Sequence, residues 1–241
     1  MPERNGYKMK NEEYEAEKKW LRQLYLEDLT KIVNYGGNPR PRVRHPNNWH
    51  RLNKDVEFLA EGVEQPADLT DRKVWVWTDQ HFYHKNIIGF CDRPFTNVDH
   101  MTEHLIANYN EYVDKDDVCI WGGDVGFGND RQINNVLRRC NGYKILVIGN
   151  HDLNKGKLRH LDFDEIHLVY LLENVLFTHY PMDNIPWPWF NVHGHLHVGG
   201  TLNTGAPDLQ YNANCELHGY RPVEFDEIRR IAKIRIEAYE Q

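Results

Sequence analysis

The feature of this sequence that most constrains its fold is a series of short apolar runs, each rich in β-branched and aromatic residues. They are "KVWVWT" (73–78), "VCIWGG" (118–123), "KILVIGN" (144–150), "IHLVYLL" (166–172), "NVLFTHY" (174–180) and "FNVHGHLH" (190–197). Uninterrupted apolar runs of this length are typical of strands that are buried on both faces. Helical segments separate several of the runs, and this alternation predicts an α/β sheet with layers packed on its faces.

Two segments between the runs are predicted helices. In "FTNVDHMTEHLIANYNEYV" (95–113) the apolar residues recur on one helical face, and Asn97 is the expected N-cap. "DRQINNVLRRCNG" (130–142) should end at its glycine. The runs at 166–172 and 174–180 are close enough to form a hairpin. The C-terminal "RRIAKIRIEAYE" (229–240) fits either a helix or a strand.

The first 70 residues are predicted to form an addition to a core domain that spans residues 71–241. Residues 11–34 have a helical apolar stripe, which predicts an N-terminal helical extension. Residues 38–54 are basic and rich in proline, which excludes a regular helix. This arm is either a solvated linker or a segment that attracts phosphate.

Composition limits the class of protein. The chain has 241 residues, a net charge of -7 and 40% hydrophobic residues, which predicts a globular protein and disfavours binding to long nucleic acid. The four cysteines form no C-x-x-C pair, so reduced thiols in a reducing compartment are expected. No apolar signal segment or run of ~20 apolar residues is visible, which predicts a soluble, cytoplasmic protein. The oligomeric state is left open.

Polar residues follow most of the apolar runs directly. In α/β sheets, ligands bind at the carboxyl ends of strands, so these residues are expected to converge there. Two Asp, one Asn and four His are candidate metal ligands: Asp79, His81, Asp124, Asn150, His179, His195 and His197. This set is too large for one tetrahedral site and suits two adjacent ions that share a carboxylate. Mixed oxygen and nitrogen donors favour manganese, with iron, zinc, cobalt, nickel or magnesium as alternatives.

The spacing of these residues predicts part of the geometry. Asp79 and His81 are two residues apart, as are His195 and His197, so each pair is expected to point the same way where an extended strand ends. Glycines at 122, 123, 149 and 194 permit tight turns and a close approach to the site.

The order of these motifs resembles that of the calcineurin-like metallophosphoesterases. The motifs are Asp79-x-His81, Gly123-Asp124, Gly149-Asn150-His151-Asp152, His179 and Gly194-His195-x-His197. The resemblance covers residues 73 to about 226. "HKNIIGFCDRPF" (84–95) and "GYRPVEFDEI" (219–228) are similar to a small bacterial and phage branch of the family, which includes phage 5′-deoxyribonucleotidases.

The resemblance implies a four-layered β-sandwich flanked by helices, with two ions at one edge. One ion would be held by Asp79, His81 and His197, and the other by Asn150, His179 and His195, with Asp124 as the bridge. A hydroxide activated by the two metals would attack phosphorus in line. His151 would face the leaving oxygen as a catalytic residue. Asp152 would orient its imidazole, unless it is a surface carboxylate.

Four further residues are candidate substrate contacts. His84 and Arg93 could either reach the substrate phosphate or form ordinary hydrogen bonds within their loop. Trp187 and Trp189 could stack a base or cover the end of the sheet. The expected substrate is a small phosphorylated molecule, and a phosphomonoesterase acting on nucleoside 5′-monophosphates fits best. The alternatives are a phosphodiesterase acting on cyclic nucleotides or short nucleic acid, and a non-enzymatic binding protein.

Overall fold

The computed structural model describes residues 3–4, 7–8, 69, 71–152, 160–182, 185, 187–197 and 209–239. The predicted helix at 11–34 and the basic arm at 38–54 lie outside the described residues. Near the N-terminus, β1 (Glu3–Arg4) pairs with β2 (Tyr7–Lys8) in an antiparallel ribbon.

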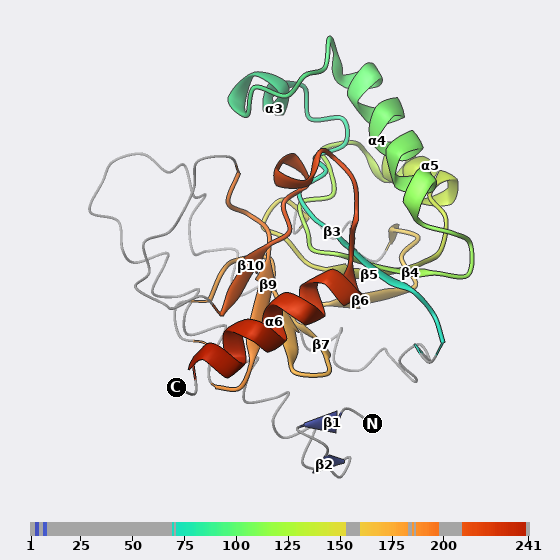
Figure 1. The fold of residues 1–241 in the computed structure, drawn as a ribbon. Coiled ribbons are helices and arrows are strands. Elements are labelled where there is room, and N and C mark those ends of the chain that lie inside the picture. Colours follow the sequence, from blue (N-terminus) through green and yellow to red (C-terminus); the bar gives the residue numbers. More distant parts are fainter. Residues whose placement is uncertain are drawn as a thin grey trace, which may run out of the picture.

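The main sheet has five strands in the order β11-β3-β4-β5-β6 (Figure 1). The strands β3 (Val74–Trp77), β4 (Val118–Trp121), β5 (Tyr143–Val147) and β6 (Glu165–His167) run parallel. The edge strand β11 (Val223–Glu224) is antiparallel to β3. Because the four parallel strands end at one edge, the loops that follow them lie next to each other.

A second sheet has four strands in the order β10-β9-β8-β7. Its strands are β7 (Tyr170–Leu172), β8 (Val175–Phe177), β9 (Phe190–His193) and β10 (Gln210–Asn212). Strand β9 is parallel to both neighbours, whereas β7 and β8 form the antiparallel hairpin that the sequence predicts.

The apolar run at 166–172 is divided between the two sheets, so its prediction as a single strand was wrong. Its first part belongs to β6, which pairs with β5 in the main sheet, and its second part is β7 in the other sheet. The chain changes sheets at Leu168 and Val169, which are both buried. Because the run is apolar throughout, hydropathy alone does not reveal this break.

Four helices accompany the sheets in the described part of the chain: α3 (Lys85–Phe90), α4 (Val98–Tyr112), α5 (Asp130–Arg139) and α6 (Phe225–Tyr239). Asn97 caps α4 as predicted, because its side chain accepts the backbone N–H of His100 at 2.8 Å. A capping box formed by Asn129 and Gln132 begins α5. The ambiguous C-terminal segment is helical.

Alternate side chains of the main sheet enter two separate apolar cores. One core joins Trp75, Trp77 and Trp121 to α4 and α5. The other joins Val76 and Ile120 to side chains of the second sheet and of α6. The main sheet is therefore covered on both faces, which explains its uninterrupted apolar runs. Taken together, the strands and helices form an α/β structure.

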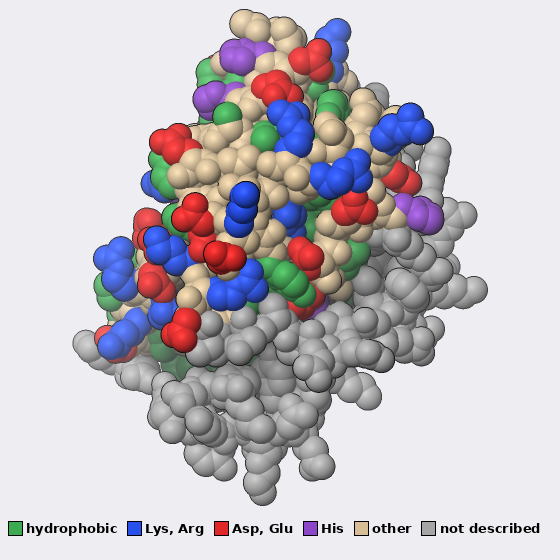
Figure 2. All heavy atoms as spheres, turned by 90° about the vertical axis from the view of Figure 1, so that its right-hand side faces the viewer, with side chains coloured by type: hydrophobic (Ala, Val, Ile, Leu, Met, Phe, Trp, Pro, Cys, Tyr) green, Lys and Arg blue, Asp and Glu red, His purple; other side chains and the backbone are tan. Residues whose placement is uncertain are grey.

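The surface carries charges of both signs. On the face that lies to the right in Figure 1, basic and acidic side chains are interspersed with one another (Figure 2). No helix in the described part of the chain has the length and apolar character needed to cross a membrane.

Candidate metal centre

The loops after β3 and β4 continue to pair beyond the sheet and carry the first site residues. The backbone N–H of Asp79 donates to Gly123 O at 3.0 Å, and that of His81 donates to Asp124 O at 3.1 Å. Phe82 donates to Val125 O at 2.8 Å. These three backbone hydrogen bonds between the two loops place the side chains of both loops at the same edge of the sheet.

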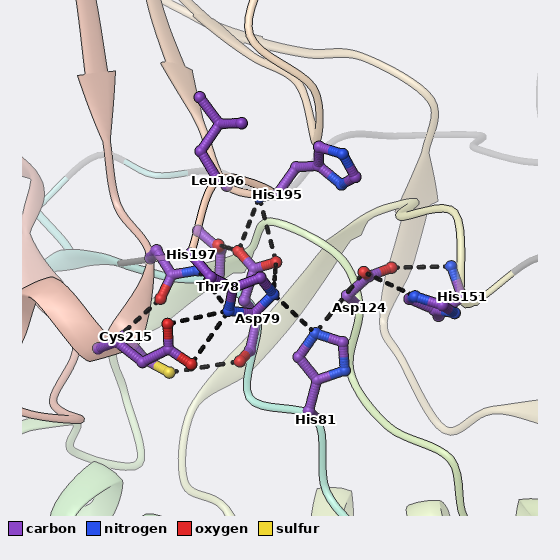
Figure 3. Close-up of polar contacts among 12 residues, drawn as sticks. Thr78, Asp79, His81, Asp124, His151, His195, Leu196, His197 and Cys215 are labelled. Carbon is purple, nitrogen blue, oxygen red and sulfur yellow. Dashed lines mark hydrogen bonds and ion pairs between the residues drawn. The ribbon is translucent and has the colours of Figure 1, made fainter. Parts of the chain in front are cut away.

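A first group of donors consists of Asp79, His81 and His197, whose ligand atoms all lie within 4.8 Å of one another (Figure 3). The Nε2 atoms of His81 and His197 are 3.3 Å apart, and His197 Nε2 is 3.8 Å from Asp79 Oδ1. Two imidazole nitrogens and a carboxylate oxygen therefore converge on one point, as the ligands of a divalent cation do.

A second group consists of Asp124, His179 and His195, also with ligand atoms within 4.8 Å of one another. Asn150 joins it, because its Oδ1 lies 3.0 Å from His179 Nε2. The two groups meet at Asp124, since its Oδ2 is 3.4 Å from His179 Nε2 and 3.7 Å from His81 Nε2. The structure thus brings together all of the predicted ligands, with Asp124 between the two groups.

The two sheets contribute to both groups. Asp79, Asp124 and Asn150 follow strands of the main sheet, whereas His179 and His195 follow β8 and β9 of the second sheet. The backbone N–H of His195 donates to both carboxylate oxygens of Asp79, at 3.1 and 3.0 Å. Thr78 Oγ1 also donates to this carboxylate. The orientation of the first ligand is therefore set from both sheets.

The local geometry differs from the predicted extended pairs. Asp79, His81, Asp124 and His195 have φ values of 59°, 54°, 53° and 65°, in the left-handed region. This conformation costs roughly 1–2 kcal/mol per non-glycine residue and is concentrated at functional sites. His195 is in the left-handed region and the Leu196 N–H donates to Gly194 O at 2.7 Å, so the prediction that His195 and His197 extend a strand together was wrong. The chain turns between them instead of continuing as a strand.

Close packing of the loops requires glycine at two positions between the groups. Gly123 has a φ of 94°, and a Cβ there would lie 2.5 Å from Gly149 N and 2.8 Å from His179 Nδ1. A Cβ on Gly149 would overlap both the backbone N and Oδ1 of Asp124. The backbones of the β4 and β5 loops therefore touch, which brings Asp124 and Asn150 together.

Burial and mutual charge set the protonation of the ligands. Burial alone would raise the pKa of Asp124, but His179, His81 and His151 hold it below its usual range. Burial would lower the pKa of His179, but Asp124 raises it to about 9. Burial lowers the pKa of His195 to about 3, and this imidazole is therefore neutral at pH 7.

Glu216, a residue that the sequence did not single out, contacts the ring nitrogen of His197 that is directed away from the first group. The carboxylate oxygens of Glu216 lie 3.0 and 2.9 Å from His197 Nδ1, which leaves Nε2 directed at Asp79 and His81. Burial would lower the pKa of His197, but hydrogen bonds with Cys91 and Glu216 raise it to about 10. Carboxylates commonly orient metal-binding histidines in this way.

Arg93 is buried and hydrogen-bonded to the β3 loop, which confirms the alternative of a loop hydrogen bond and excludes the phosphate contact. Its side chain is buried, and its guanidinium donates to Glu216 Oε1 at 2.7 Å and to the backbone oxygens of Gln80 and Asp79 at 2.8 Å each. It ties the β3 loop to the carboxylate that holds His197. Cys91, His197 and Glu216 also satisfy the distances of a metal site. However, the guanidinium on Glu216 already supplies the positive charge there.

His151 lies at the rim of the site, and its neighbour Asp152 is buried. The His151 side chain is 40% exposed, and its Nε2 is 3.8 Å from Asp124 Oδ2. The Asp152 carboxylate accepts backbone N–H bonds from Asp124, Val125 and Gly149 at 2.8–3.0 Å. Asp152 therefore holds the two loops and is buried, so its prediction as a surface carboxylate was wrong, whereas its orienting of the imidazole stays a prediction.

The other predicted substrate contacts differ in whether they are near the site and accessible to a ligand. His84 is close to the first group, with its Nδ1 3.4 Å from His81 Nδ1. Trp187 is 46% exposed, whereas Trp189 is only 2% exposed and packs in the interior. A stacking role for Trp189 is therefore excluded by burial. Phe127, which the sequence did not mark, stacks on His84 with ring centroids 3.8 Å apart.

Comparisons with known proteins agree with the fold. No family model matches this chain. Over 170 residues it is 29% identical to the uncharacterized protein MJ1445 of Methanocaldococcus jannaschii, covering 68% of this chain and 93% of that protein. It is also similar to the crystal structure of AQ665, a protein of unknown function from Aquifex aeolicus, with a TM-score of 0.54 and 27% identity. This match covers 67% of this chain and 100% of the other. The α/β fold of this chain therefore recurs in a solved structure.

Proposed function

We propose that this chain is a metal-dependent phosphomonoesterase that acts on nucleoside 5′-monophosphates. The observation that carries the proposal is the pair of donor groups joined at Asp124, whose Oδ2 lies within 3.7 Å of a histidine from each group. We also assign the two sheets to a calcineurin-like β-sandwich, because side chains of both sheets share one apolar core.

The residues fit a pair of divalent cations. Each group combines imidazole nitrogens with a carboxylate oxygen, and Asn150 adds an amide oxygen to the second group. Such mixed donors suit manganese, iron, zinc, cobalt or nickel better than magnesium. Burial holds the pKa of His81 well below its usual value, so its imidazole is neutral and has one unprotonated nitrogen available as a ligand. The unpaired thiols of the four cysteines support a reducing compartment such as the cytoplasm.

The chain's own residues would prepare the site for phosphoryl transfer. When bound, the two cations would supply an activated water and offset charge on the phosphoryl oxygens. Asp79, Asp124 and the histidines would hold them, and Glu216 would keep His197 in its ligating orientation. His151, at the exposed rim and 3.8 Å from Asp124, is placed to give a proton to the leaving oxygen.

A small substrate is favoured over a polymer. The net charge is -7. The face in Figure 2 mixes basic with acidic side chains, so this face has no continuous basic surface that could bind a nucleic-acid backbone. A membrane partner is not part of the proposal.

The test is a metal-supplemented activity screen on the full chain. We expect Mn²⁺-dependent hydrolysis of p-nitrophenyl phosphate to exceed that of its bis ester, and nucleoside 5′-monophosphates to be preferred over cyclic nucleotides. Asp124→Asn should reduce turnover by at least ~10³-fold and lower the bound metal measured by elemental analysis. Asp116→Asn, at an exposed carboxylate outside the site, is the matched control.

Two outcomes would contradict the proposal. Faster hydrolysis of the bis ester or of cyclic nucleotides would make the protein a phosphodiesterase. No metal-dependent turnover of any phosphoester, with metal still bound, would indicate a binding protein built on the same site.

A further inference from the structure

Phe127 is an exposed aromatic residue at the rim of the candidate metal centre. Its side chain is 43% exposed, although its ring is surrounded by histidines of the site. The ring centroid lies 3.8 Å from that of His84, 4.7 Å from that of His151 and 5.8 Å from that of His81. An apolar ring next to a ligand and the proposed proton donor, yet left open to solvent, is placed to contact substrate.

The loop that carries Phe127 is held firmly. Its backbone N–H donates to Phe82 O at 2.8 Å, and Gly126 forms a bridge with Phe82. A Cβ on Gly126 would lie 2.6 Å from Phe82 O, and one on Gly128 would lie 2.8 Å from Tyr83 Cδ2. Both glycines therefore allow the loop to pack directly on its neighbour. The backbone that carries the ring is therefore held in place, which lowers the entropy lost when a ligand stacks on the ring.

A pocket of ≈ 70 Å³ opens beside Phe127. A cavity needs about 10–15 Å³ of this volume to hold one water molecule, so the pocket has room for more than a single water. Apolar side chains of Val125, Ile133 and Leu161 form much of its wall, and His151 lies at the side nearest the ligands. The pocket is therefore on the side where His151 would meet the leaving oxygen.

Among the described residues that line the pocket, none has a permanently positive side chain. Among its described lining residues there is no lysine or arginine, and the two charged members are Asp130 and Asp152. The carboxylate of Asp152 is occupied by backbone N–H groups, and Asp130 adds negative charge at the start of α5. A second phosphate on the leaving group would lie beside the Asp130 carboxylate and would find no lysine or arginine among the described lining residues to pair with, which is unfavourable.

We propose that Phe127 and this pocket receive the leaving group of the substrate, and that this group is uncharged and planar, as is the nucleobase end of a nucleoside. This inference rests on the proposed phosphomonoesterase activity and adds the subsite that contacts the nucleoside part of the substrate. It also replaces Trp189, which is buried, as the aromatic contact.

The experiment compares two substrates that carry the same phosphate on the same sugar carbon, adenosine 5′-monophosphate and ribose 5-phosphate. The wild-type protein should have the higher kcat/KM for the nucleotide. Base stacking on an aromatic side chain contributes about 1–3 kcal/mol, so Phe127→Ala should lower the ratio of the two kcat/KM values by ~10-fold or more. Phe127→Trp should preserve the ratio.

Phe90→Ala is the matched control, because Phe90 is also an exposed aromatic next to His84 but does not line the pocket. It should leave the ratio unchanged. Metal content and thermal unfolding of each variant report whether the fold is intact. An unchanged ratio in Phe127→Ala, while p-nitrophenyl phosphate is still hydrolysed, would overturn this inference alone. Loss of all phosphoester turnover in the wild-type protein would overturn the proposed function and this inference with it.

Discussion

The carboxylate of Asp124 lies between two groups of donors, and its backbone is in the left-handed region with a φ of 53°. Its Oδ1 accepts the backbone N–H of His151 at 2.8 Å, and its backbone N–H donates to Asp152. Every polar atom of this residue that faces the site is therefore engaged. Such over-determined positions are where proteins keep an unfavourable backbone conformation.

His151 contacts Asp124 through its backbone N–H, and its imidazole remains partly exposed at the rim. We expect His151→Ala to lower kcat by roughly 10²–10⁴-fold, the usual contribution of a general acid. Bound metal should stay near the wild-type amount, because neither donor group includes His151. Kinetics combined with elemental analysis checks this. Loss of metal in His151→Ala would show that the residue is a ligand and not a proton donor.

At the scale of elements, the loops after β4 and β5 depend on contact between two glycines. Gly123→Ala adds a Cβ 2.5 Å from Gly149 N and places alanine at a φ of 94°. We expect a loss of several kcal/mol in the free energy of unfolding, or misplacement of Asn150 with loss of metal, because the added atom meets backbone. Thermal unfolding and metal content are the measurements.

Gly89→Ala provides the control for that variant. Gly89 lies within α3, and a Cβ there meets nothing within 4 Å. Alanine is favoured over glycine in a helix by about 1 kcal/mol, so this change should be neutral or stabilising. If Gly123→Ala and Gly89→Ala lowered the free energy of unfolding by the same amount, the close approach of the β4 and β5 loops would not be required for stability.

The short helical turn η3 (Cys215–His218) supplies the carboxylate that orients His197. Glu216→Gln removes this charge from His197 and from the buried Arg93. Metal affinity should fall by about 10–100-fold, the usual effect of losing such a partner. A metal titration monitors the change, and Glu237→Gln on the exposed side of α6 is the control. If Glu216→Gln lowers the unfolding temperature while metal affinity stays unchanged, the carboxylate serves only the fold.

At the scale of the whole molecule, the donor groups join the two sheets. Ligands from the main sheet and from the second sheet meet in both groups. Metal binding to the folded state should therefore raise the unfolding temperature in a concentration-dependent way, and a chelator should reverse it. An unfolding temperature that does not respond to Mn²⁺ or chelator would contradict a metal link between the sheets.

Metal binding is also predicted to release protons. In the absence of metal, His179 and His197 have pKa values of about 9 and about 10, and are protonated at pH 7. A cation must displace these protons, so its apparent affinity should rise with pH up to those values and fall on acidification. Calorimetry in buffers of different ionisation enthalpy measures the released protons. Binding that is independent of pH between 6 and 8 (about the range in which unperturbed histidine titrates) would contradict it.

Local patterns were enough to predict β3, β4, β5, β8 and β9, the helix cap at Asn97 and the candidate ligands, because these depend on hydropathy, capping chemistry and position after a strand. The division of residues 166–172 between two sheets depends on long-range packing, and an apolar run gives no local sign of it. Contacts across long sequence separations likewise decided the roles of Arg93, Asp152 and Glu216. Burial excluded Trp189, and the exposed position of Phe127 beside the site was likewise a result of packing, because the sequence alone does not show which aromatic side chains are covered.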